Sequence, residues 1–489
     1  MALDFERLSR ELKENVVLTA LKSALTADAY IVGGFLRDSL LGRKPQDVDL
    51  VICGDFELAC AQVAKVLGRE PFQLGERFAS RRVLFDGFIV DLSPIYESNL
   101  TEDLSRRDFT INALCLPLKC VGRRVTRDDL IDSFGGLKDL EKQEITAISE
   151  KSLREDPLRM LRAFRFALEL SFTIEPITLK LIEIRGNEIA SVAGERIREE
   201  LLRILCHSAS FAVIQQMVKV GFLFCLFPEL DITRGVTQNE YHHLPVFEHS
   251  LECVKEFEAL ITDWDGVRQE LHSPISEHLS EVVTPPGTRS ALVKLALLFH
   301  DIGKPATRQM QADGKVTFYG HQKVGREIVE PILDRLRMSA REKDLVLLLI
   351  EEHLRVGFYC NESPITPKLI HRFERRLGDA TVMSAVHALA DARATRGPAA
   401  DEVFQKTHLE VVNEILWHHF FGKEITEPIP LLTGDDIMRV TGIPESPRIG
   451  ELKEALLEAQ VEGKVKTRAD AEEFVLKLAR EQMKTENSF

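Results

Sequence analysis

The spacing of the apolar residues changes near residue 150, and no other feature of the sequence restricts the fold as strongly. Before that point, short β-branched runs end in glycine or in turn residues, and we expect strands at residues 28–32, 47–52, 82–85 and 88–92. Beyond it, apolar residues recur at spacings of three and four, as in amphipathic helices. The sequence therefore predicts an α+β chain, with a small α/β domain followed by all-α domains.

The helical part is divided further by turn residues. The polar stretch 265–289, which contains Pro-Pro-Gly, is predicted to be an insertion loop between two helices. The turn residues at 397–401 mark a second boundary, where the helical pattern is interrupted. A chain of 489 residues has room for several domains of about 150 residues each. We expect four domains, at residues 1–146, 147–232, 233–400 and 401–489.

Composition and charge exclude several classes of protein. Hydrophobic residues make up 44% and charged residues 29% of the chain, which excludes a disordered or fibrous protein. The net charge of −14 means that any nucleic acid would have to bind a local basic surface. The first residues are charged throughout and the longest aliphatic run, residues 345–350, is too short to span a bilayer. We expect a cytoplasmic protein without an export signal or a membrane partner, with its eight cysteines reduced because no CxxC pair is present.

Histidine is distributed unevenly along the chain. None of the 14 histidines precedes His207, and ten lie between His242 and His387. A site in the first half must therefore use carboxylates, which suit hard ions such as Mg²⁺. The second half can offer mixed His and Asp ligands, which suit transition metals. Two separate chemistries are predicted.

A candidate phosphate site lies where the first predicted strand meets a helix. Gly33 and Gly34 occupy this junction, so free backbone N–H groups and the positive helix end can hold phosphate oxygens. Arg37, one turn into the helix, can add a positive charge. The plain alternative is that the two glycines only form a turn.

A candidate metal site follows on the next strand. Asp47 and Asp49 alternate along it, so that both carboxylates face the same side and can share divalent ions. Asp91, in the strand FIVDLS, can bring a third carboxylate to that face. Three carboxylates, two Mg²⁺ ions and a nucleoside triphosphate are the components of in-line nucleotidyl transfer. The alternative is that the two aspartates solvate an edge strand.

The combination of these two sites resembles the head domain of the class II CCA-adding enzyme and bacterial poly(A) polymerase family. Further stretches resemble motifs of this family in the same order along the chain: SRRDFTINA at 105–113, DSFGGLKDL at 132–140, EDPLR at 155–159 and GERIREEL at 194–201. For 132–140 an ordinary glycine turn, and for 194–201 a salt-bridged helix face, are equally good interpretations.

The resemblance implies roles for individual residues. Arg107, Asp108 and Asn112 would hold the ribose and triphosphate, as arginines and hydrogen-bonding side chains can. Asp156 and Arg159, three apart on one helix face and with Arg162 one turn further, would read the Watson–Crick edge of the incoming base. The alternative for this stretch is structural, with Asp156 as a helix N-cap before Pro157 and Glu155 paired with Arg159.

A second resemblance lies in the histidine-rich half. His249, the pair His300-Asp301 at the end of an apolar helix, and Asp391 resemble the H…HD…D signature of HD phosphohydrolases. His321 and His353 would complete a two-metal version, with Mn, Fe, Co, Ni or Zn as the ion and bound water as the nucleophile. The alternative is an inactive helical bundle that only carries RNA. We interpret His242, His243, His418 and His419 as surface or packing residues.

Together these features predict a nucleotidyltransferase head followed by neck, HD and tail domains. The resemblance implies a template-independent tRNA nucleotidyltransferase that builds or repairs the 3′-terminal CCA from CTP and ATP, with the tRNA 3′ end as partner. Family members that complete the whole end usually carry a long loop after the third carboxylate, whereas here few residues separate Asp91 from Arg106. Addition of CC only or A only is therefore an open alternative, as are a poly(A) polymerase, an HD phosphohydrolase with the head as a nucleotide sensor, and an RNA-binding protein. The sequence does not predict an oligomeric state.

Overall fold

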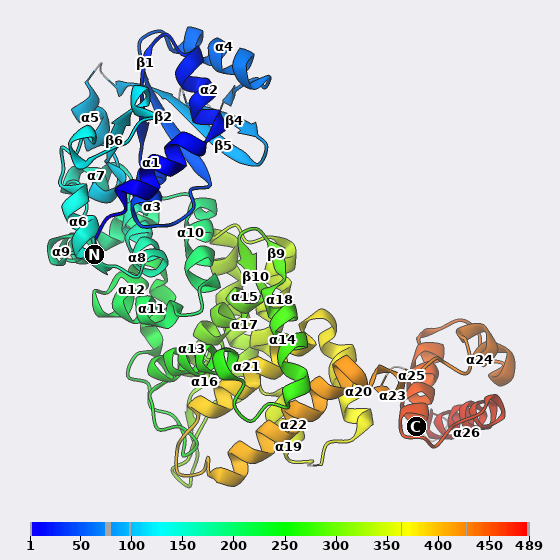
Figure 1. Ribbon diagram of the computed structural model, residues 1–489. Coiled ribbons are helices and arrows are strands. Elements are labelled where there is room, and N and C mark those ends of the chain that lie inside the picture. Colours follow the sequence, from blue (N-terminus) through cyan, green and yellow to red (C-terminus); the bar gives the residue numbers. More distant parts are fainter. Residues whose placement is uncertain (1, 74–79, 97–98, 363, 427, 487–489) are drawn as a thin grey trace. The chain divides into compact units, whose positions relative to one another are not determined.

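The computed structural model describes all residues except 1, 74–79, 97–98, 363, 427 and 487–489. The chain divides into two compact units, which consist of Met1–Ile204 with Val213–Leu226 and of Leu205–Ala212 with Phe227–Phe489. The first unit contains a small sheet and the second is almost wholly helical (Figure 1). The predicted α+β class is confirmed, whereas the division into four domains stays a prediction.

The first unit is built on a six-stranded sheet with the order β3-β4-β5-β2-β1-β6. β2 and β5 pair in parallel, and the other neighbours are antiparallel. The four strands expected from the sequence are present, with bounds that differ by up to two residues. The strands are β1 (Asp28–Val32), β2 (Asp47–Cys53), β3 (Phe72–Gln73), β4 (Arg81–Phe85), β5 (Phe88–Pro94) and β6 (Cys115–Pro117).

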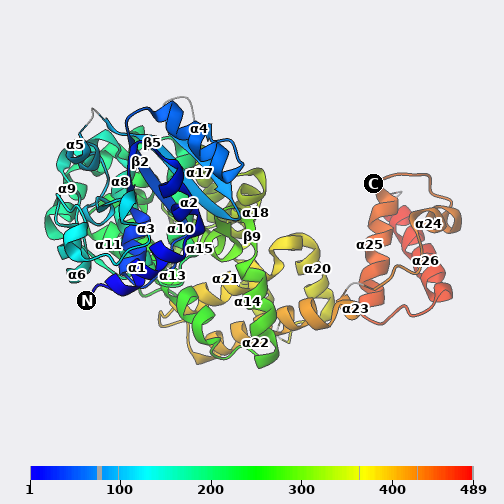
Figure 2. The same cartoon turned by 45° about the horizontal axis from the view of Figure 1, so that its top comes forward.

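Helices flank this sheet and continue beyond it (Figure 2). α8 buries ten of its 13 residues, because its apolar side chains recur around most of the helix. It ends at Ser171 in the left-handed conformation. The main helices of the unit are α1 (Phe5–Glu14), α2 (Val16–Ala24), α3 (Gly34–Leu40), α4 (Phe56–Leu67), α5 (Leu100–Ser105), α6 (Gly136–Lys142), α7 (Glu150–Glu155), α8 (Leu158–Leu170), α9 (Pro176–Arg185), α10 (Gly194–Cys206), α11 (Ser210–Lys219) and α12 (Phe222–Leu226).

The second unit is a helical bundle around α15 and α21. Ten of the eleven residues of α15 are buried, and the two charged ones among them, Arg289 and Lys294, form ion pairs with Glu281 and Glu258. α13 and α18 pack against both central helices, and α22 packs on α21. The helices of the bundle are α13 (Val246–Asp263), α14 (His272–Ser280), α15 (Arg289–Phe299), α16 (Lys304–Thr307), α17 (His321–Arg335), α18 (Ala340–Glu352), α19 (Arg355–Cys360), α20 (Pro367–Leu377), α21 (Thr381–Ala394) and α22 (Glu402–Phe421).

The prediction of an insertion loop at residues 265–289 is wrong. This stretch contains α14 and a short hairpin of β9 (Val282–Thr284) and β10 (Gly287–Thr288). Pro274 lies in the first turn of α14, where a missing N–H costs nothing, and Pro285-Pro286 form the hairpin turn. Proline in this segment therefore begins a helix and turns a hairpin.

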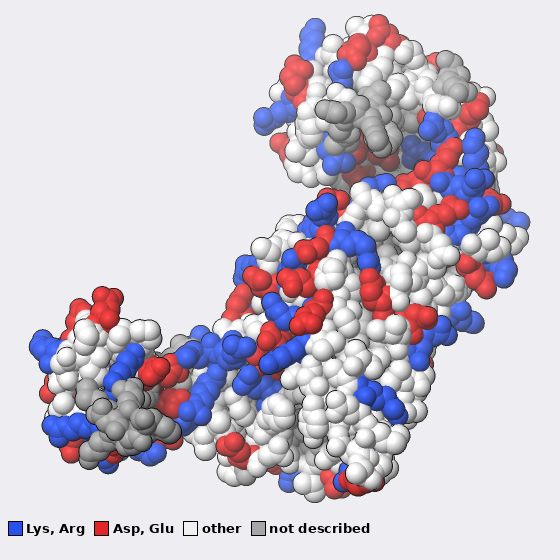
Figure 3. Space-filling view, turned by 180° about the vertical axis from the view of Figure 1, so that it is seen from behind, with Lys and Arg blue, Asp and Glu red and all other residues white. Residues whose placement is uncertain are grey.

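The last helices enclose a small core of their own. Leu432, Ile437, Leu452 and Val475 are among its fully buried side chains. The helices of this core are α24 (Gly434–Thr441), α25 (Pro447–Val461) and α26 (Arg468–Glu486), whereas the short α23 (Lys423–Thr426) packs on α20 and α22. Among the described residues no helix is both long and apolar enough to cross a bilayer. Lys and Arg side chains alternate with Asp and Glu side chains on the face in Figure 3.

Candidate active sites

The sheet brings the three predicted carboxylates of the head together. Asp49 and Asp91 are direct partners in the parallel register of β2 and β5, and Asp47 lies two residues earlier on β2. Since residues two apart on a strand point to the same face, all three carboxylates share one side of the sheet.

The glycine turn lies directly over these carboxylates. Gly33 has φ +75°, which L-residues with a side chain rarely adopt. A Cβ atom there would lie 2.9 Å from Arg107 Nη1 and 3.1 Å from Asp49 Oδ2. Glycine therefore lets the start of α3, with its free N–H groups, approach the carboxylates closely, as the phosphate prediction requires.

Burial and mutual repulsion disfavour the ionised forms of the clustered carboxylates. Burial, with added repulsion from Asp47 and Asp91, raises the pKa of Asp49 to about 6, although Arg107 opposes the shift. The Arg107 guanidinium lies 3.8 Å from the Asp49 carboxylate. Burial, followed by repulsion from Asp91, also raises the pKa of Asp47. Clustered carboxylates whose ionised forms repel one another form a ligand set for divalent ions.

The third carboxylate has a partner that no sequence motif indicates. Arg82, on β4, donates two hydrogen bonds of 2.7 Å to the two oxygens of Asp91. The two residues are register partners on antiparallel strands. This contact depends on the strand order, which the sequence does not show.

The residues expected to hold ribose and triphosphate form one hydrogen-bonded chain. Arg37 Nη1 donates to Asn112 Oδ1 at 2.6 Å, and Asn112 Nδ2 donates to Asp108 Oδ1 at 2.9 Å. Arg162 then donates to Asp108 Oδ2 at 2.6 Å. Burial alone would raise the pKa of Asp108, but Arg162 and Asn112 keep it below its usual range. The head and the helix α8 thus share one polar network.

The two residues predicted to read the base have different surroundings. Arg196 donates to both oxygens of Asp156, at 3.1 and 2.8 Å. This carboxylate therefore does not cap α8, which has no side-chain cap. Arg159 Nη1 donates to the backbone oxygens of Ser152 at 2.9 Å and of Arg107 at 3.3 Å. These contacts fix the start of α8 next to the head motif.

The second unit brings all six predicted HD residues to one place. Asp301 lies between the other ligands, with Oδ2 3.2 Å from His300 Nε2 and Oδ1 3.3 Å from His321 Nε2 and 3.8 Å from His353 Nε2. Asp391 Oδ1 lies 2.9 Å from His249 Nε2. The six come from five helices or helix ends: His249 from α13, His300 and Asp301 after α15, His321 from α17, His353 after α18 and Asp391 from α21.

Backbone contacts fix the tautomers of three histidines. The Nδ1 atoms of His300, His321 and His353 lie 2.8, 2.7 and 2.6 Å from the carbonyl oxygens three residues earlier. Each Nδ1 therefore carries the proton and donates it to the carbonyl, which leaves the Nε2 lone pair free to bind an ion. Burial, with repulsion from neighbouring histidines, lowers the pKa of His353 well below its usual range and keeps its ring neutral.

These lone pairs fit a metal centre. The Nε2 atoms of His321 and His353 face each other at 3.1 Å, and two lone pairs so placed repel unless a proton or a metal cation lies between them. His300 Nε2 and Asp301 Oδ1 are buried without a hydrogen-bond partner. Buried polar atoms normally have a partner, so the donor set itself indicates a cation.

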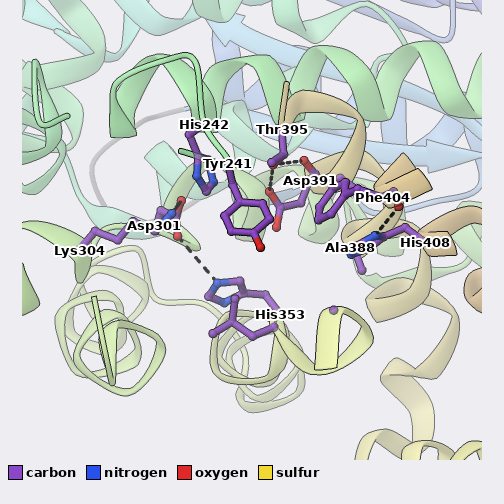
Figure 4. Close-up of a pocket in the computed structure, with 13 residues that line it drawn as sticks. Tyr241, His242, Asp301, Lys304, His353, Ala388, Asp391, Thr395, Phe404 and His408 are labelled. Atoms are coloured by element: carbon purple, nitrogen blue, oxygen red, sulfur yellow. Dashed lines mark hydrogen bonds and ion pairs between the residues drawn. The ribbon is translucent and has the colours of Figure 1, made fainter. Parts of the chain in front are cut away.

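A pocket of about 170 Å³ opens onto this cluster (Figure 4). Asp301, His353 and Asp391 line it together with Tyr241 and Phe404, whose ring centroids lie 5.9 Å apart. Lys304 lies at the same opening, and its Nζ donates to Asp301 Oδ2 at 2.6 Å. Because small-molecule pockets are commonly about 300 Å³ or larger, this one suits the phosphate end of a ligand.

His242, interpreted above as a surface or packing residue, packs against the HD cluster. Its ring lies 4.7 Å from that of His249, and burial lowers its pKa to about 2. His242, His249 and Asp301 form a group that can hold an ion. The sequence feature that brings His242 to the cluster is Gly397. A Cβ atom there would lie 2.3 Å from the Glu240 carbonyl oxygen, so only glycine lets the loop at Gly397 pack against the loop that contains Glu240 and His242.

Fold and sites together define a nucleotidyltransferase head joined to an HD-type metal-binding domain. Family models match in the same order: the poly A polymerase head domain at residues 29–146, a probable RNA-binding site of polymerase A at 171–233 and the HD domain at 246–376.

Two full-length relatives identify the family. The A-adding tRNA nucleotidyltransferase of Deinococcus radiodurans is 32% identical, over 93% of this chain and 96% of its own length. The CC-adding tRNA nucleotidyltransferase of Thermus thermophilus is 30% identical, over 92% and 93%. The chain belongs to the CCA-adding tRNA nucleotidyltransferase family, and it is a nucleotidyltransferase.

Solved structures share the fold over nearly the whole chain. A CCA-adding enzyme in complex with ATP has a TM-score of 0.67 at 20% identity, covering 99% of this chain and 98% of that one. The CCA-adding enzyme of Thermotoga maritima, solved with tRNA, has a TM-score of 0.63 at 22% identity, covering 97% and 99%.

Proposed function

We propose that the head of this chain adds the two cytidines of the tRNA 3′ end from CTP and stops before the terminal adenosine. The observation that carries this proposal is the short connection between the third carboxylate and the RRD motif. β5 ends at Pro94 and α5 already begins at Leu100, and residues 97–98 between them lie outside the described part. The long loop that the family resemblance links to full CCA addition does not fit into this connection. The chain is similar both to the CC-adding enzyme of Thermus thermophilus and to the A-adding enzyme of Deinococcus radiodurans, so the short connection alone carries the choice.

Different residues of the head would bind different parts of the reacting nucleotide. The tRNA 3′ hydroxyl attacks the α-phosphate of CTP and releases pyrophosphate, so negative charge on the triphosphate must be neutralised. Gly33, Gly34 and Arg37 would hold phosphate oxygens, and Asp108 and Asn112 the ribose. Bound divalent ions would activate the hydroxyl and stabilise the leaving pyrophosphate.

We assign the ions of the head to Mg²⁺ held by the three carboxylates. Carboxylate oxygens are the ligands that this hard ion prefers. Asp49 and Asp91 are register partners on the neighbouring strands β2 and β5, and Asp47 lies on the same face of the sheet. Neighbouring ions can therefore share the three carboxylates.

Substrate tRNAs that end at the discriminator base, at C and at CC test the assignment with CTP and ATP supplied separately. We expect CTP incorporation on the first two and no addition of A to the tRNA that ends in CC. Efficient incorporation of A on that tRNA would show that the enzyme completes CCA. Incorporation of A without any incorporation of C would identify an A-adding enzyme.

We propose that the HD domain is a separate metal-dependent phosphohydrolase that acts on phosphoester ends, such as the 2′,3′-cyclic phosphates of damaged tRNA. The facing lone pairs of His321 and His353 and the small pocket above Asp301 support this proposal. Imidazole ligands favour Mn, Fe, Co, Ni or Zn. Hydrolysis should weaken at acidic pH, where the histidine ligands become protonated and release the ion, and burial moves this step for His353 well below the usual histidine range of pKa.

Purified protein supplied in turn with Mn, Co, Ni and Mg and with cyclic or 2′-nucleotide substrates tests this second activity. His300→Ala should abolish hydrolysis and leave CTP incorporation nearly unchanged, because the two sites use separate ions. The absence of hydrolysis with every ion would leave the HD bundle as a scaffold.

A further inference from the structure

A cysteine that neither proposed activity uses lies inside the HD cluster. Cys253 follows His249 by one turn of α13, so both side chains point to the same face of the helix. Its Sγ lies 3.4 Å from His249 Nε2 and 3.8 Å from Asp391 Oδ1. The side chain is fully buried. Buried cysteines usually pack against apolar groups, whereas this one faces an imidazole and a carboxylate.

The distances among these atoms fit one shared ion. His249 Nε2 and Asp391 Oδ1 are 2.9 Å apart, so the three ligand atoms form a triangle with sides of 2.9, 3.4 and 3.8 Å. Atoms that bind zinc at about 2.0–2.3 Å lie about 3–4 Å from one another. A single ion can therefore touch all three without movement of a helix.

A fourth donor, which also lies 3.2 Å from Asp301 Oδ2, is directed to the same place. His300 Nε2 lies 3.9 Å from Asp391 Oδ1, and it is buried without a hydrogen bond. His249, Cys253, His300 and Asp391 form a group whose ligand atoms all lie within 4.8 Å of one another. This set has two imidazoles, one thiol and one carboxylate.

We infer that Cys253 is a ligand of the HD centre and that its thiolate makes this ion position selective for thiophilic metals such as Zn²⁺, Co²⁺ or Cd²⁺ over Mg²⁺. The inference rests on the proposed HD metal site and adds a ligand to it. Soft thiolate prefers soft or borderline ions, whereas Mg²⁺ prefers oxygen. Binding of the ion releases the thiol proton to solvent, because only the thiolate is a ligand.

The test uses cobalt as a spectroscopic probe, and it does not depend on turnover. Full-length protein titrated with Co²⁺ should develop a thiolate-to-cobalt charge-transfer band in the near ultraviolet, which nitrogen and oxygen ligands alone do not produce. Cys253→Ser should bind Co²⁺ without this band. Cys360→Ser is the matched control, because Cys360 is half-buried in the same unit and belongs to no group that can hold an ion.

A competition titration measures the selectivity. Loss of an outer partner of a metal site typically costs about 10- to 100-fold in affinity, and loss of a ligand should cost at least about 100-fold. Cys253→Ser should therefore weaken Zn²⁺ binding by at least about 100-fold and change Mg²⁺ binding by less than about threefold. Thermal unfolding of the same variant reports whether the second unit is folded, and Cys253→Ala provides a second variant.

The outcomes separate this inference from the proposal on which it rests. Cobalt bound by the wild-type protein without a charge-transfer band, or a band that persists in Cys253→Ser, would overturn the thiolate ligand and leave the HD metal site standing. Failure of the wild-type protein to bind any transition metal would overturn both.

Discussion

Replacement of Gly33 by alanine should damage the head through two separate effects. The first is backbone strain, because φ +75° and ψ −132° lie in a region that is nearly restricted to glycine and cost about 1–3 kcal/mol for other residues. The second is local crowding, since the new Cβ would lie 2.9 Å from Arg107 Nη1 and 3.1 Å from Asp49 Oδ2. The end of a long arginine can move away, so we expect Arg107 to leave Asp49 while the fold survives.

Two other glycines separate these effects. Gly42 has the same φ of +75° but no atom within 4 Å of a new Cβ, so Gly42→Ala should show strain without loss of activity. Gly34 has no positive φ, and its Cβ would make only an ordinary contact with Arg37 at 3.7 Å. Gly34→Ala should therefore leave stability nearly unchanged.

Thermal unfolding and CTP incorporation together measure the outcome. A loss of about 2–3 kcal/mol corresponds to about 4–12 °C in Tm for a unit of this size. We expect Gly33→Ala to unfold in that range below wild type, and to lose at least about 100-fold in kcat/KM, which is about 2.7 kcal/mol of transition-state stabilisation. Wild-type incorporation by Gly33→Ala, together with a Tm equal to that of Gly42→Ala, would refute the argument that the turn lies against the carboxylates.

Three further predictions concern the head and neck. Asp47→Asn and Asp49→Asn should each abolish CTP incorporation without loss of the fold, because neither carboxylate can replace the other as a bridge between ions; full activity of either folded variant, in an incorporation assay, would remove the proposed site. Arg159→Ala should shift the choice between CTP and ATP by about 1–3 kcal/mol, because the partner of a lost hydrogen bond stays unpaired; equal losses for all four nucleotides would exclude a role in base choice. The pKa of Asp108 is lower in the folded chain than in the unfolded chain, where it is about 3.9, so the ionised carboxylate stabilises the fold. This contribution to the free energy of unfolding is fully present above about pH 3.9, and it is lost as the pH falls through the folded pKa. Urea unfolding of Asp108→Asn should accordingly depend less on pH below about 4 than unfolding of wild type, and equal slopes would show that the ion pair with Arg162 contributes no pH dependence.

Strand alternation and helix periodicity predicted the fold class and the shared face of the head carboxylates, whereas their role came from the family resemblance. The strands expected around the DVD motif placed Asp47 and Asp49 on one face, and the structure has them there. Arg82 could not be assigned in the same way, because a residue on β4 contacts Asp91 only if β4 and β5 are neighbours in this register. Which strands pair is decided by packing across the whole sheet, which is not visible in a local pattern.

The HD centre also contains a residue whose position depends on contacts between distant segments and could not be predicted from a local sequence pattern. Its six predicted residues follow from a spaced signature, whereas His242 lies in a loop without any period. That loop reaches His249 because the backbone at Gly397 packs against it, with the Gly397 N–H donating to the Tyr241 carbonyl at 2.7 Å. A side chain at position 397 would push the loop outward and remove both Tyr241 and His242 from the pocket. The positions of the residues that line the mouth of this site therefore depend on the close approach of two distant segments. Gly397→Ala should weaken hydrolysis at the HD site, while the buried histidine ligands keep their ion.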